Sequence, residues 1–173
     1  PARVERELNA RILTPYLHDH FWWMGNGAEP MCNWTSWCTQ NVLLMMFLLP
    51  TTQAERRSAV EQAAYSLDCF LKDYGPDGCC NEGAQYYRHA GLTLWGALEI
   101  LAQAAPEAFR PLFAEPKIRN MAEYILNVHV EGPYYLNFGD CSPLAGRCGA
   151  REYRFGQAVG SEALCALAAA DYR

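Results

Sequence analysis

Three short stretches of the sequence combine aromatic rings with polar side chains that can carry acid–base chemistry. They are "HFWWMGNG" at residues 20–27, "CNWTSW" at 32–37 and "PDGCCNEGAQYYRH" at 76–89. Aromatic rings stack on sugars, while amide, carboxyl and imidazole groups form hydrogen bonds with hydroxyls. The three stretches therefore predict a carbohydrate site built from loops at helix ends.

Metal chemistry has little support. His18 and His20 form an H-x-H pattern, but a protein metal site needs further ligands. The eight cysteines include no C-x-x-C pair, and several lie in apolar stretches such as "LDCFL", where a free thiol behaves as a small hydrophobic group. We therefore expect structural thiols, no metal and no cofactor. Free thiols also favour a reducing compartment, the bacterial cytoplasm over the periplasm.

Composition and charge argue against two classes of partner. The net charge is −5 and no run of Lys or Arg occurs, whereas binding to nucleic acid or an anionic membrane requires clustered basic residues. The longest apolar run, 42–49, is much shorter than the ~20 residues that span a bilayer. We expect no nucleic-acid partner and no membrane span.

Hydrophobic periodicity predicts a succession of helices that must position these side chains. Their expected ranges are 2–18, 33–49, 53–72, 83–104, 116–128 and 152–170. Pro15 should kink or break the first, and Pro50 should end the second. Strand signals are confined to short pieces such as "YYLNF", so the class is all-α with minor short β pairings in loops.

The chain of 173 residues has the length of a single domain with a substantial core. Helices of this length fit a bundle or an (α/α) toroid of helical hairpins, and periodicity does not separate the two. The polar and aromatic loops favour the toroid. The chain starts at Pro1 and stops within an apolar helical stretch, so we expect a piece of a longer polypeptide.

Several ordered blocks of the sequence resemble the heparinase II/III-like proteins. The blocks are "RILTPYLHDHFWWMG", "NWTSWCTQNVLLMMFLL", "YGPDGCCNEGAQYYRHAGLTLWGALEIL" and "LNFGDCSP". The resemblance implies an incomplete (α/α) toroid followed by a β-sandwich that lies beyond residue 173. It also implies a polysaccharide lyase that cleaves uronic-acid polymers, glycosaminoglycan-like or alginate-like, by β-elimination. The piece alone should be inactive or weakly active, because a cleft formed against a missing C-terminal domain would be half built.

β-Elimination at a uronate needs a group that neutralises the C5 carboxylate, a base for the C5 proton and an acid for the departing O4. The resemblance places the catalytic Tyr at Tyr86, with Tyr87 packing elsewhere. An unperturbed phenol titrates near 10, so Arg88 or His89 is the candidate that stabilises a phenolate. His89 should share a helix face with Tyr86. The alternative for Tyr86 is a hydrogen-bonded residue at a helix start.

Asn33 matches the amide of the family's "NW" block and is the candidate for holding the uronate carboxylate. Its alternative role is the N-cap of the helix that begins there. Trp34, Trp37 and Asn41 follow on one face and would continue the wall of the cleft, although core filling is the alternative for either Trp.

Two carboxylates complete the candidate substrate-binding set. Glu82 would orient Tyr86 or cap a helix start, and Asp140 would shape the cleft or form an Asx turn. His129 is expected to be a surface or helix-end residue.

Two other functions stay open. A glycoside hydrolase on the same fold would need two facing carboxylates. A non-catalytic glycan-binding module would keep the aromatic rings without needing Tyr86.

Overall fold

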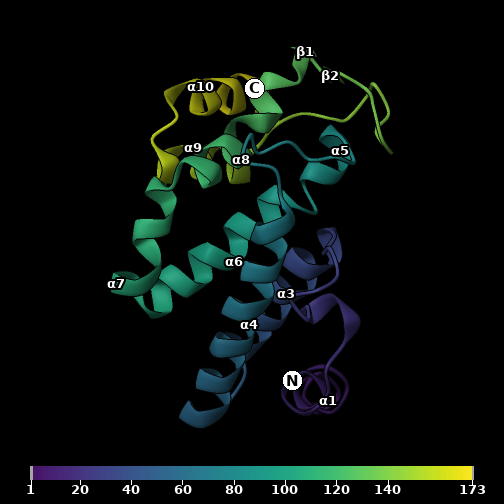
Figure 1. The fold of residues 1–173 in the computed structure, drawn as a ribbon. Coiled ribbons are helices and arrows are strands. Elements are labelled where there is room, and N and C mark those ends of the chain that lie inside the picture. The colour runs from purple at the N-terminus through teal and green to yellow at the C-terminus, as the bar shows by residue number, and fades with distance from the viewer. Residues whose placement is uncertain (1, 173) are drawn as a thin grey trace.

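The computed structural model describes residues 2–172 and is all-α, as predicted (Figure 1). The long helices are α3 (Asn33–Leu48), α4 (Gln53–Asp73), α6 (Gly91–Ala104), α8 (Pro116–Asn127), α9 (Ala150–Val159) and α10 (Glu162–Asp171). In Figure 1, α3 and α4 run side by side in one half of the molecule, and α8, α9 and α10 pack together in the other. Helix α6 contacts members of both groups and joins them.

The N-terminal helix is continuous but changes its winding. It consists of α1 (Ala2–Leu8), the π-helical turn η1 (Asn9–Leu13) and α2 (Thr14–His18). Pro15 lies just after the wide turn, which accommodates a ring that cannot donate a backbone hydrogen bond. The kink predicted at Pro15 is therefore a widened turn placed just before it.

Two predicted helices are each divided in the structure. The range 83–104 contains α5 (Ala84–Tyr87), a turn and then α6, because Ala90 leaves helical geometry. The range 152–170 is divided between α9 and α10 by Gly160, which adopts φ 70°, and by Ser161, whose hydroxyl accepts from the Leu164 amide. Both breaks are short turns within otherwise apolar periodicity, which a periodicity argument passes over.

Short elements fill the remaining connections. They are η2 (Trp22–Met24), α7 (Pro106–Phe109) and η3 (Arg110–Ala114), none of which the periodicity predicted. Strands β1 (His129–Glu131) and β2 (Tyr134–Tyr135) form an antiparallel hairpin around Gly132. This hairpin confirms the minor β pairing expected near "YYLNF".

The main core lies where α6 crosses the other helices. Leu94, Leu98 and Leu101 of α6 are fully buried, and they belong to a cluster that includes Tyr87 and Phe155. A second cluster packs α3 against the N-terminal helix through Met46 and Leu13. Within residues 2–172, no helix combines the length and apolarity that crossing a membrane requires.

Candidate functional site

The start of α3 and the segment before α5 are joined through Asn33 and Glu82. The Asn33 Nδ2 donates to both Glu82 carboxylate oxygens, at 3.0 and 3.3 Å. Asn33 is only 5% exposed. The N-cap of α3 is Cys32, without a side-chain cap, so the capping role considered for Asn33 is wrong. The Asn33 side-chain amide instead bonds to Glu82, 49 residues further along the chain.

The capping role considered for Glu82 is wrong as well. The N-cap of α5 is Gly83, and no side chain caps that helix. Burial and the nearby charge of Asp140 raise the pKa of the Glu82 carboxyl, and the Asn33 hydrogen bond opposes the shift. The neutral Asn33 amide supplies no positive charge to offset the cost of burying the Glu82 carboxylate. Glu82 is therefore a carboxyl whose pKa lies above its ordinary value.

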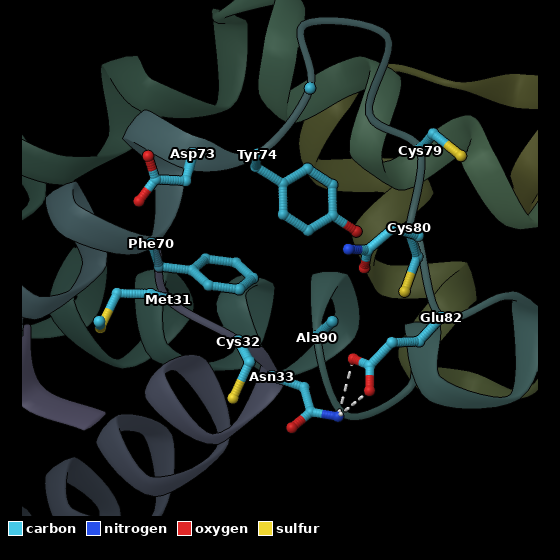
Figure 2. A pocket seen from close by; sticks show the side chains of 12 residues that line it. Met31, Cys32, Asn33, Phe70, Asp73, Tyr74, Cys79, Cys80, Glu82 and Ala90 are labelled. Carbon is cyan, nitrogen blue, oxygen red and sulfur yellow. Dashed lines mark hydrogen bonds between the residues drawn. The ribbon is translucent and has the colours of Figure 1, made fainter. Parts of the chain in front are cut away.

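A cavity of ≈ 370 Å³ opens beside this pair (Figure 2). Figure 2 shows Asn33 and Glu82 at one end and the Tyr74 and Phe70 rings across from them. The residues that line the cavity are Met31, Cys32, Asn33, Phe70, Asp73, Tyr74, Gly75, Cys79, Cys80, Asn81, Glu82 and Ala90. Sequence reasoning found Asn33 and Glu82 but missed the rest. The end of α4 reaches this cavity only through tertiary packing.

Tryptophan rings lie on the surface at the start of α3. Trp34 is 52% exposed and Trp37 is 40% exposed, so core filling is wrong for both. The Trp22 ring, on η2, lies 5.8 Å from the Trp34 ring between centroids. Three Trp rings on a protein surface form a face that can stack on sugars.

Tyr86 and His89 adjoin this aromatic face. The Trp37 and His89 ring centroids are 4.3 Å apart, and those of Tyr86 and His89 are 6.0 Å apart. Helix α5 ends at Tyr87, so His89 lies in the following turn and not on the same helix face as Tyr86. The turn nevertheless brings the two rings together. Tyr87 is fully buried and donates to the Ala122 carbonyl, which confirms its packing role.

The surroundings of the His89 imidazole favour its neutral form. Burial, Arg88 and Arg151 all lower its pKa. Its Nδ1 is buried and has no hydrogen-bond partner among the described residues. No hydrogen bond of the Tyr86 hydroxyl is found in residues 2–172, so the alternative of a hydrogen-bonded Tyr at a helix start is wrong.

Arg88 does not reach the candidate site. Its guanidinium pairs with Glu152 at 3.4 Å and donates to the carbonyls of Ala145 and Arg147. Glu152 also accepts from the Gly149 amide, and its side chain is 5% exposed. The predicted role of Arg88 in phenolate stabilisation or substrate binding is therefore wrong, because its donors hold the 145–152 region against α5.

The two remaining candidates, Asp140 and Asn41, are exposed on the surface. The charge of Asp140 contributes to the raised pKa of Glu82. None of the hydrogen bonds in the described chain includes the Asp140 carboxylate, so the Asx turn is not formed. Asn41 is exposed and accepts from Gln40 Nε2 at 3.4 Å. None of the hydrogen bonds in residues 2–172 joins Asn41 to Tyr86 or His89.

Two of the remaining histidines make local contacts. His20 and His129 each hydrogen-bond a carbonyl a few residues away, those of Gly25 and Gly132. His129 lies two residues beyond the end of α8 and is the first residue of β1. All eight cysteines are free thiols. Within the described chain, no three His, Cys, Asp or Glu side chains are grouped to hold a metal ion.

Two comparisons with known proteins give no relative. No family model matches the chain, and no curated protein matches it.

Proposed function

We propose that this chain is the helical, incomplete (α/α) toroid portion of a polysaccharide lyase that cleaves uronic-acid polymers by β-elimination. The observation that carries the proposal is the continuity of the aromatic face with a pair of titratable rings. Trp37 contacts His89, and His89 contacts Tyr86. A sugar stacked on the Trp rings would therefore lie beside groups that can move protons.

Tyr86 serves as the acid and base of the proposed reaction. The C5–H electron pair becomes the C4=C5 double bond, and the bond between C4 and O4 breaks. O4 leaves with a proton from the Tyr86 phenol. Arg88 pairs with Glu152, and the pKa of His89 is lowered, so neither of the two candidate cations favours a phenolate. In this proposal a ring nitrogen of His89 accepts the phenol proton, so that Tyr86 can take the C5 proton and then pass it to O4.

The uronate carboxylate lies near Asn33 in this proposal. Asn33 shares its Nδ2 with Glu82, so an incoming carboxylate meets an amide that is already oriented. Preorganised donors of this kind stabilise the enolate that forms as the C5 proton leaves. Trp34 and Trp37 hold the neighbouring sugars by stacking.

A hydrolase is the second candidate, and one observation favours it. Burial and the nearby charge of Asp140 raise the pKa of Glu82, and glycoside hydrolysis requires a carboxyl that can act as an acid together with a second carboxylate. Glu82 would then be the acid and Asp140 the base or nucleophile.

One assay separates the candidates. The protein, produced with its native flanking sequence, is incubated with a panel of uronate polymers, and the ultraviolet absorbance of the unsaturated product is followed. We expect absorbance to grow, and Tyr86→Phe to slow it by about 10²–10⁴-fold because the proton donor is lost.

Tyr153→Phe, an exposed position on α9, is the matched control and should leave the rate unchanged. If new reducing ends appear without any rise in ultraviolet absorbance, the lyase proposal is wrong and the protein is a hydrolase. If the protein binds the polymers but forms no product, it is a non-catalytic glycan-binding module.

A further inference from the structure

Arg151, the second residue of α9, carries a positive charge whose direct partners are neutral. Its Nη2 donates to the Gln40 side-chain oxygen at 2.6 Å and to the Leu92 carbonyl at 3.0 Å. No ion pair within residues 2–172 includes Arg151. Arg154, three residues later on the same helix, pairs with Glu99 at 2.8 Å. The charge of Arg151 is therefore free to act on a ligand, whereas that of Arg154 is already paired.

The contacts of Arg151 place it near the aromatic face. Gln40 follows Trp37 by one turn of α3, and residues at this spacing are neighbours on a helix surface. Leu92 lies in the first turn of α6, directly after the turn that carries His89. The charge of Arg151 also contributes to the lowered pKa of His89. Arg151 therefore lies close to the contact between the Trp37 and His89 rings.

The guanidinium of Arg151 is held in position while part of it stays accessible. Its Cζ lies over the Trp95 ring, 5.9 Å from the ring centroid, and Trp95 is itself buried. Gly96 leaves room for this arrangement, because a Cβ there would lie 2.1 Å from the Gln40 Oε1 and 3.1 Å from the Arg151 Nη2. Arg151 as a residue is exposed, and no hydrogen bond of its Nε or Nη1 is found in residues 2–172. An anion would therefore meet a guanidinium that is already oriented.

The surroundings of Arg151 have more hydrogen-bond donors than acceptors. Two donor nitrogens of the guanidinium have no acceptor within the described chain, and neither does the buried Nε1 of Trp95 beneath it. The planar fork of an Arg side chain fits two oxygens on one centre, and such charge-assisted pairs are stronger than neutral hydrogen bonds. Carboxylates and sulfate esters both present oxygens in this way.

We infer that Arg151 binds an anionic group of the polymer, a carboxylate or a sulfate ester, on the sugar that stacks on Trp37. This inference rests on the proposed function, which lays the polymer across the Trp rings with Tyr86 at the reacting sugar. It adds a second anion contact, separate from the one proposed at Asn33. Arg151 thereby selects polymers in which the sugar beside the cleaved uronate is also charged, because an uncharged neighbour loses this contact.

Three hexasaccharides on one β-1,4-mannose backbone test the inference, because they differ only at C6. Hexamannuronate has a carboxylate there, 6-O-sulfated hexamannose a sulfate ester, and hexamannose a hydroxyl. The protein is produced with its native flanking sequence and with Tyr86→Phe, so that the proposed reaction does not consume the sugar. Each sugar is titrated by calorimetry at neutral pH. We expect at least one charged hexasaccharide to bind about tenfold more tightly than hexamannose, and the tighter of the two identifies the anion.

Two variants remove the free charge by different routes. Arg151→Gln deletes the cation, whereas Gln40→Glu keeps it and places a carboxylate where a neutral oxygen now accepts the 2.6 Å hydrogen bond. Each should weaken binding of the charged hexasaccharide by about tenfold and leave hexamannose binding unchanged. Arg154→Gln is the matched control, because Arg154 is already paired with Glu99, and it should change neither affinity.

Gln40→Glu also separates binding from folding. A carboxylate at position 40 forms an ion pair with Arg151, so the melting temperature should stay the same or rise while the affinity for the charged sugar falls. Damage to the fold would lower the melting temperature and the affinity for every sugar together.

Several outcomes overturn the inference. It is wrong if the three sugars bind alike, if Arg154→Gln weakens binding as much as Arg151→Gln does, or if hexamannose loses the same affinity in the variants. It is also wrong if a folded Gln40→Glu protein binds the charged hexasaccharide as tightly as the parent protein does.

The proposed function fails or holds in a different measurement, the ultraviolet assay with Tyr86 intact. If no unsaturated product forms but Arg151→Gln still weakens binding of the charged sugar, the anion site stays and the lyase proposal is wrong. If product forms and Arg151→Gln changes neither the rate nor the affinity, the lyase proposal stays and the anion site is wrong.

Discussion

Two partly buried polar pairs hold the two ends of the segment 82–88, which carries Tyr86, and they differ in charge. Glu82 is held by the neutral amide of Asn33 beside an open cavity. At the other end, Arg88 is held by the buried carboxylate of Glu152, which also accepts a backbone amide. The second pair is neutral as a whole, whereas the first retains an uncompensated carboxyl. Carboxyls with shifted pKa values cluster at functional sites, so this difference points to the Glu82 end of the segment.

The largest expected effect comes from breaking the compensated pair. Arg88→Ala leaves the Glu152 carboxylate buried without a cation, and we expect the free energy of unfolding to fall by about 3–5 kcal/mol. Urea denaturation followed by circular dichroism measures it. Arg119→Ala is the matched control, because Arg119 pairs with Glu123 at the surface, and it should cost less than about 1 kcal/mol. Equal losses in the two variants would show that the Arg88 pair is not structural.

An intermediate effect is expected when the neutral partner of Glu82 becomes an anion. Asn33→Asp places two carboxylates in contact and removes the amide donor, so unfolding free energy at pH 7 should fall by about 1–3 kcal/mol. The loss should shrink as the pH falls, because one carboxyl then takes up a proton. Thermal unfolding from pH 4 to pH 8 checks both points. Asn41→Asp, exposed on the same helix, serves as control, and a loss there of the same size would contradict the assignment.

The smallest effect is expected from removing the uncompensated charge itself. The pKa of Glu82 is raised in the folded protein, so the folded state binds more protons than the unfolded state between the ordinary Glu value and the raised one. The contribution of Glu82 to the stability of the wild type therefore falls as the pH rises through that window. Glu82→Gln lacks this titration and can still accept from Asn33.

Melting temperatures measured against pH check this sign. Glu82→Gln and the wild type should agree below the ordinary Glu pKa, and the variant should be more stable at neutral pH. Glu29→Gln, in an exposed loop, should follow the wild type throughout. A variant that loses stability as the pH rises, as the wild type does, would mean that Glu82 is not the titrating group.

Local patterns predicted most helix positions. The structure has α3 at Asn33–Leu48 and α4 at Gln53–Asp73, within a residue of the predicted ranges. Pro50 and the Thr52–Glu55 capping box set that boundary through backbone hydrogen bonding, which is a property of adjacent residues. The turn at 88–90 escaped prediction because the side chains on both sides of it are apolar or small.

The sequence by itself determined the helices, the absence of a basic patch, and the gathering of Trp, Tyr and His residues at helix ends. Only the tertiary structure decided what those side chains contact. Asn33 meets Glu82, the end of α4 supplies the far wall of the cavity, and Arg88 turns away to Glu152. The reason is physical: helix formation depends on residues three or four apart, whereas the charge and solvation of a side chain depend on partners tens of residues away.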